Sequence, residues 1–356
     1  MRLFSQILGI VLCSLFMVKP LMAQVLPPHT DYSEIVAIGE KLKQSKTLPL
    51  ATEPRATLKT RQQTISEPVV QEALSGVRKW LDRPLQLAKP SGVEDDLKFL
   101  GAGRLIARTL IIQQYVQLAG GKVRDAIDTT RDTLRLAYTL QNHSLIGIMG
   151  GVALETFAVG GLNPHLDQLS LPDCQALAQL AQDWSGTQDI LSFTLKREYI
   201  LGMERLRVQV GESNPQYKEI SVAVKQMYED MLVLQAKPYL QRTELVLQGD
   251  IEARRGADVI IGTLRPVVLR AFDSYTKRLA QARMLFCHAT IRRYRWENHK
   301  LPASLEELRV GDMGIDPFTD QPFKYVVQEA TFTLTSAGPF ERDSTGTQNR
   351  DQRKPF

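Results

Sequence analysis

The sequence predicts a mainly α-helical protein, with a helical-hairpin body followed by a small α+β module at the C-terminal end. The chain has 356 residues, of which 43% are hydrophobic but only 7% aromatic. This composition favours packed helices over a β-sandwich. Apolar residues recur at helical spacing through most of the chain. Near the C-terminus, the alternation from Thr331 to Thr335 is instead typical of a half-buried strand.

Residues 1–23 have the layout of a secretory signal peptide. Arg2 supplies the positive charge, residues 3–18 are mostly apolar, and Ala23 occupies the cleavage position. The apolar stretch is shorter than the ~20 residues that a membrane span needs. We therefore expect cleavage and export to the periplasm or the cell exterior. The alternative is an uncleaved membrane anchor formed by residues 3–18.

The charge distribution argues against nucleic-acid binding. The formal net charge is +5, but the basic residues are dispersed among acidic ones, apart from Arg292-Arg293-Tyr294-Arg295 and the tail. A nucleic-acid-binding protein normally clusters its basic residues on one face.

Removal of the signal segment would leave two cysteines, Cys174 and Cys287. Exported proteins meet an oxidising compartment, so a Cys174–Cys287 disulfide is a candidate. The alternative is two buried free thiols, since cysteine packs as a small hydrophobic residue.

The N-terminal part of the mature chain, residues 24–65, is rich in Pro, Thr, Lys and Gln, which predicts a flexible linker. It contains one short amphipathic piece, in which Ile35, Ile38 and Leu42 lie at helical spacing. The helical body is expected at residues 66–265.

Within this body, residues 97–118 and the segment from Val123 to Tyr138 predict a helical hairpin that turns at Gly120 and Gly121. Gly121, Val123, Ala126, Ile127 and Leu134 match the pattern of one tetratricopeptide unit. The hairpin resembles that repeat over one unit only, because the register does not recur 34 residues later. The resemblance implies tetratricopeptide-like helix packing and not an array.

Residues 145–162 are apolar on all sides, which predicts either a buried helix or a membrane span. Glu155 lies near the middle, where a charge would be costly in lipid, so we expect a buried core helix. A buried carboxylate needs a partner. The same holds for Glu198, on an otherwise apolar helix side. Arg104 and Arg108, one turn apart on a mostly apolar helix, are the candidate partners.

These four residues allow two interpretations. Glu155 and Glu198 are the weak catalytic candidates, as the acid and base of a hydrolase in a polar pocket. The alternative is a structural ion-pair network with Arg104 and Arg108. The second is favoured because no other motif completes an active site.

Residues 266–341 predict a long helix followed by a small sheet. The segment carries Leu301-Pro302, Asp316-Pro317, Pro322-Phe323 and a closing Ser336-Ala337-Gly338. It resembles the globular part of the major pseudopilin of type II secretion. A similar ending is common in uncharacterised bacterial envelope proteins with helical bodies, and this chain looks like one of them.

The resemblance implies a fold and not a filament. The N-terminus is an ordinary secretory signal, and the acid-rich spacing of a calcium loop is missing after Gly338. Residues 342–356 form a polar tail that we expect to be disordered.

The chemistry-bearing motifs of enzymes are missing from the sequence. The five histidines have no metal-ligand spacing, and neither a nucleophile motif nor a phosphate-binding glycine loop is present. We therefore expect no cofactor and no metal. The leading hypothesis is an exported, non-enzymatic interaction or scaffold protein with envelope protein partners. The alternatives are a periplasmic hydrolase and a membrane-anchored accessory of a secretion or pilus-like system.

Overall fold

The computed structural model describes residues 29–30, 32–83, 87–88, 93–142, 144–186, 190–242, 257–342 and 348–356. It confirms the mainly α fold with a small α+β module at the C-terminal end. The predicted signal segment, residues 1–23, lies outside the described residues. The helices are α2 (Ser33–Leu42), α3 (Leu48–Ala51), α4 (Leu58–Ser66), α5 (Pro68–Leu81), α6 (Val93–Ala119), α7 (Val123–Gln141), α8 (Leu145–Leu162), α9 (Leu171–Ser185), α10 (Ile190–Val210), α11 (Pro215–Ala236) and α12 (Ala257–Asn298). The strands are β1 (His29–Thr30), β2 (Leu87–Ala88), β3 (Ile315–Asp316), β4 (Gln321–Pro322), β5 (Lys324–Gln328), β6 (Thr331–Thr335), β7 (Phe340–Arg342) and β8 (Gln348–Arg353).

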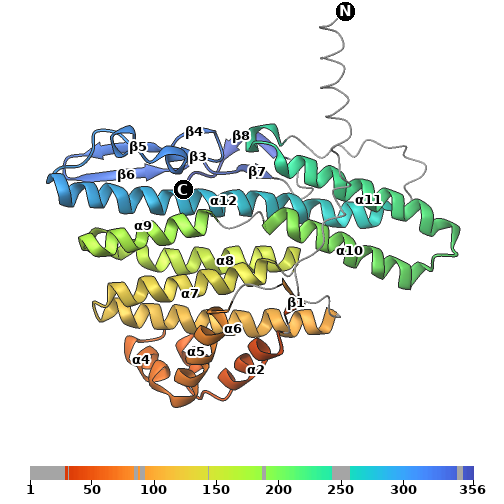
Figure 1. The fold of residues 1–356 in the computed structure, drawn as a ribbon, viewed down its shortest axis with the longest axis horizontal. Coiled ribbons are helices and arrows are strands. Elements are labelled where there is room, and N and C mark those ends of the chain that lie inside the picture. Colours follow the sequence, from red (N-terminus) through yellow and green to blue (C-terminus); the bar gives the residue numbers. More distant parts are fainter. Residues whose placement is uncertain are drawn as a thin grey trace, which may run out of the picture.

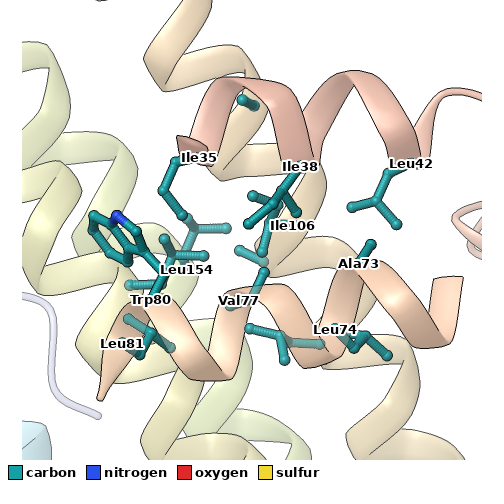
Figure 2. Packing of buried hydrophobic residues seen from close by; sticks show 14 of the residues in the cluster. Ile35, Ile38, Leu42, Ala73, Leu74, Val77, Trp80, Leu81, Ile106 and Leu154 are labelled. Atoms are coloured by element: carbon teal, nitrogen blue, oxygen red, sulfur yellow. The ribbon is translucent and has the colours of Figure 1, made fainter. Parts of the chain in front are cut away.

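The expected linker is folded over most of its length. Three helices, α2, α3 and α4, lie between residues 33 and 66 and pack against α5 and α6. Figure 2 shows Ile35, Ile38 and Leu42 of α2 directed toward α5, with Ile106 of α6 beside them. The prediction of a flexible linker is therefore wrong for this part. The prolines misled it, because Pro49 stands in the first turn of α3, where proline is tolerated.

The predicted hairpin forms the next layer, as α6 and α7. Its turn contains Gly121 with φ of 70°, a left-handed conformation that suits glycine. Helix α8 follows after a short connection. Helix α7 packs against α6 and α8, and α12 packs against α8 and α9 (Figure 1). Ser144 starts α8 as its N-cap, accepting a hydrogen bond from Gly147 N at 3.0 Å.

Helix α12 is longer than the sequence predicts. It begins at Ala257 and continues through Pro266, so the expected boundary between body and module falls inside one helix. The helix contacts α8 and α9 along one side and the strands along the other (Figure 1). Ala282 and Ala289 pack toward α9, whereas Cys287 and Ile291 pack toward the strands. Small residues let α12 approach α9 closely.

The C-terminal module consists of antiparallel strand pairs around a turn at Asp316. Strand β3 pairs with β4, β5 with β6, and β7 with β8. Buried Asp316 accepts hydrogen bonds from Phe318 N at 3.0 Å and Ala337 N at 2.7 Å. These bonds connect the turn to the end of the β5–β6 hairpin.

The expected disordered tail is ordered over residues 348–356. Strand β8 pairs with β7, and the final carbonyl, of Phe356, accepts a hydrogen bond from Ser336 N at 2.8 Å. The prediction of disorder is wrong here, because backbone pairing orders a polar segment whose side chains carry no strand pattern. Residues 343–347 lie outside the described part.

Candidate functional site

The structure does not bring the four predicted site residues together. Glu155 is fully buried in α8, and Glu198 is half-buried in α10. Arg104 and Arg108 of α6 are exposed. The expected pairing of these arginines with Glu155 or Glu198 is therefore wrong within the described residues.

Glu155 pairs instead with Arg278 of α12. The Arg278 Nε atom lies 3.1 Å from the carboxylate, and Trp184 Nε1 of α9 donates to the same carboxylate at 3.0 Å. Arg278 also donates to the Trp184 carbonyl at 2.9 Å. Complete burial raises the pKa of Glu155, and the neighbouring Arg278 guanidinium opposes this. The arrangement joins three helices by buried polar contacts.

Sequence reasoning missed Arg278 as the partner. The two residues are 123 positions apart, and Arg278 lies among several arginines and lysines of α12. Its near-complete burial is the feature that distinguishes it from them. The periodicity of α12 alone carries no such signal.

Glu198 has a different contact, at the start of α8. Its Oε1 atom accepts a hydrogen bond from Leu145 N at 2.9 Å. Free backbone N–H groups and the positive end of the helix dipole at an N-terminus both favour a carboxylate. Glu198 therefore caps α8 from α10, far along the chain from the helix it stabilises.

The two cysteines are free and buried, and the candidate disulfide is absent. Cys174 belongs to the cluster between α9 and α12, whereas Cys287 faces the C-terminal strands and donates to the Met313 carbonyl at 3.2 Å. Burial raises the pKa of the Cys174 thiol to about 11 and that of the Cys287 thiol to about 12. The structure thus matches the alternative of two buried free thiols.

A groove lies along α6 and α8, closed on one side by the segment that leads into α4. Its volume is about 840 Å³, which is within the range of about 300–1,000 Å³ that small-molecule sites occupy. Ile111 of α6 and Leu154 and Phe157 of α8 contribute to apolar walls. Gly150 leaves open space beside them, since a Cβ atom there would meet no atom within 4 Å.

The described lining of this groove contains basic side chains and no carboxylate. They are Arg61 of α4, Arg104 and Arg108 of α6, and His165 after α8. Within the described residues, none of the three arginines forms an ion pair with a carboxylate. The Arg61 guanidinium instead lies over the Tyr115 ring, 4.2 Å from its centroid. The groove therefore combines apolar walls with an uncompensated positive charge.

Helix α8 is not buried on all sides, contrary to the sequence prediction. Ile146 and Phe157 are each 67% exposed and Met149 is 41% exposed. With Ala153, they follow one another at steps of three, four and four residues, along one face. The opposite face holds Glu155 and the core residues. The sequence could not show this, because a helix that is apolar all round carries no periodicity.

By length and composition alone, one helical stretch in the described part of the chain, Leu145–Gln168, could cross a membrane, and 56% of its apolar window is buried. No group of three or more His, Cys, Asp or Glu residues suited to a metal ion occurs among the described residues.

Comparisons with known proteins give no assignment. The chain matches no family model, no curated protein and no solved structure. The resemblances to a tetratricopeptide unit and to the major pseudopilin therefore stay predictions.

Proposed function

We propose that this chain is an exported, non-enzymatic interaction protein that holds an apolar, negatively charged partner in the groove between α6 and α8. The observation that supports this is the uncovered apolar face of α8 beside three arginines without carboxylate partners. Contiguous exposed apolar surface in a folded chain commonly marks a binding site. Arginines without a carboxylate partner in the protein favour a ligand that supplies the negative charge.

The hydrolase alternative has less support. Glu155 is fully buried and contacts Arg278 and Trp184, whereas Glu198 accepts a bond from the α8 backbone. An acid–base pair must reach the same substrate at hydrogen-bond distance. Neither carboxylate lines the groove.

Export is supported by the layout of residues 1–23 alone, and the membrane-anchored alternative depends on residues 3–18. The mature protein should begin at Gln24 and fractionate as soluble. A retained Met1 in the membrane fraction would move the proposal to an anchored accessory protein.

The binding role is tested by native mass spectrometry of protein purified from its host without detergent. We expect an adduct on the wild type that is lost in Gly150→Trp. Gly150 borders the open space of the groove, so the tryptophan side chain would occupy the space of the ligand. Gly160→Trp is the matched control. Gly160 lies on the same helix, also has no atom within 4 Å of an added Cβ, and is not part of the groove.

A broad hydrolase screen tests the alternative on the same preparations. The interaction role predicts no turnover by the wild type. Turnover that Glu155→Gln and Glu198→Gln both abolish, in variants that remain folded, would overturn it.

A further inference from the structure

We infer that the groove binds a single-chain anionic amphiphile, with its acidic head at Arg104 and Arg108 and its acyl chain along α8. This inference rests on the proposed binding role and names the ligand class. Carboxylate and phosphate heads share the chemistry that the two guanidinium groups recognise. The source, a free fatty acid or a lysophospholipid, is distinguished by the experiment below.

The direction of the groove follows from the helix order. Because α7 turns back between them, α6 and α8 run the same way (Figure 1). Gln114 Nε2 of α6 donates to the Ala158 carbonyl of α8 at 2.7 Å. This bond sets the position of α6 relative to α8 along the helix axes. Arg104 and Arg108 precede Gln114 by ten and six residues, about 15 and 9 Å along the axis. The two charges therefore lie toward one end of the groove.

In the other direction the lining continues along α6 past Ile111 to Leu118 and Ala119. From Arg104 to Ala119, which both line the groove, the helix rises about 22 Å. One leaflet of a bilayer, half of the ~30 Å hydrocarbon core, offers about 15 Å to an acyl chain. The groove is thus long enough for one acyl chain and its head.

The walls suit an acyl chain better than a polar ligand. Ile111 and Phe157 face the groove from the two long helices, and small Gly150 and Ala153 leave room along α8. Tyr115 of α6 also lines the groove, and the Arg61 guanidinium of α4 lies over its ring. No carboxylate contributes to the described lining, so an acidic head meets no like charge.

An amphipathic partner helix fits less well. A helix is about 10–12 Å across with side chains, whereas the groove, with a volume of about 840 Å³, has the size of a small-molecule site. Binding of a protein segment is therefore an alternative result that the experiment distinguishes.

The experiment uses full-length mature protein, stripped of lipid and kept free of detergent. A fluorescent fatty acid reports binding, and palmitate, lysophosphatidylglycerol and neutral monopalmitoylglycerol compete for the site. We expect the anionic competitors to bind at least tenfold more tightly than the neutral one. Whichever anion is the tighter identifies the source of the head group.

Variants locate the head and the chain. The double variant Arg104→Gln and Arg108→Gln should bind both anionic competitors at least tenfold more weakly. Its affinity for the neutral competitor should not change. Arg55→Gln with Lys59→Gln is the control, because it removes two exposed charges of a neighbouring segment that do not line the groove. Gly150→Trp should abolish binding of all three competitors, and Gly160→Trp should retain it.

Equal affinity for neutral and anionic competitors, or unchanged affinity in the double arginine variant, would overturn the inference. If no amphiphile binds but the host-purified protein carries a peptide adduct that Gly150→Trp loses, the ligand class is wrong and the binding role stands. If Gly150→Trp changes no adduct and no affinity, the binding role itself fails.

Discussion

Arg278 and Glu155 form an ion pair that connects the helical body to the C-terminal helix. The Arg278 Nε atom lies 3.1 Å from each carboxylate oxygen, and the two side chains are 1% and 0% exposed. Trp184 holds both partners through its indole N–H and its carbonyl. The pair therefore fixes α8, α9 and α12 relative to one another.

Removing one partner of this pair should strongly destabilise the fold. We expect Glu155→Ala to lower the free energy of unfolding by about 3–5 kcal/mol, because Arg278 would be left buried without its counter-charge. The exposed Lys43–Glu40 pair is the control, and Glu40→Ala should cost less than about 1 kcal/mol. Urea unfolding measures both. A Glu155→Ala variant as stable as the wild type would contradict this account.

The sequence predicted features with a visible period and missed those that depend on distant contacts. The α6–α7 hairpin follows from the spacing of Ala126, Ile127 and Leu134 and from its glycine turn. The partner of Glu155 was not predictable, because 123 residues separate it from Arg278 and an amphipathic pattern does not rank one arginine above another.

The groove was missed for a related reason. Arg104 and Arg108 lie one turn apart on a largely apolar helix, which suggested buried partners, whereas in the fold this face of α6 is open. Which face of the uniformly apolar α8 is buried depends on how α6, α7 and α12 pack around it. Only tertiary structure supplies that information.

The packing of the N-terminal helices is tested at Gly39. A Cβ atom there would lie 2.5 Å from the Ala102 Cβ atom and 2.8 Å from its Cα atom. Gly39→Ala should therefore destabilise the protein by about 1–3 kcal/mol, although alanine is the better helix former. Gly101→Ala is the control, since it has open space in α6 and should stabilise by up to about 1 kcal/mol. Thermal unfolding that shows stabilisation by both variants would contradict the close contact of α2 and α6.

The two thiols should be unreactive in the folded protein. Thiolate is the reactive form, and burial raises the pKa to about 11 for Cys174 and about 12 for Cys287. Alkylation by iodoacetamide at pH 8 should be at least about 100-fold slower than in denaturant. The intact mass should not change on reduction. A mass gain of two hydrogens on reduction would show that the Cys174–Cys287 disulfide forms after all.

Asp316 should be essential to the C-terminal module. Its carboxylate accepts bonds from Phe318 N, Ala337 N and Ser336 Oγ, all near or inside the core. Asp316→Ala leaves these donors without an acceptor and should cost about 2–4 kcal/mol, since each unsatisfied buried donor costs about 1–3 kcal/mol. Asp312→Ala, at an exposed position of the same module, should stay within about 0.5 kcal/mol of the wild type. Chemical unfolding and hydrogen exchange of β5 and β6 measure the difference.

His288 should make the attachment of the module dependent on pH. Its ring lies 4.6 Å from the Phe332 ring of β6, measured between centroids, and burial lowers its pKa to about 4 from 6.5. Within the described residues its Nδ1 atom has no hydrogen-bond partner, and the Arg292 guanidinium lies over the same Phe332 ring. Both features disfavour a charged imidazole.

The sign of the pH effect follows from proton counting. Between pH 6.5 and 4 the unfolded chain binds a proton at this histidine and the folded chain does not. The contribution of His288 to stability is thus complete above pH 6.5 and is lost as the pH falls toward 4, by roughly 3 kcal/mol. His288→Phe should keep the contact with Phe332 and remove this part of the pH dependence. His299→Asn is the control and should leave the pH dependence of stability unchanged. His299 is exposed, and its φ of 57° is one that asparagine tolerates. Parallel acid-unfolding curves for the wild type and His288→Phe would show that the ring is solvated and that the α12–β6 contact is weaker than the structure indicates.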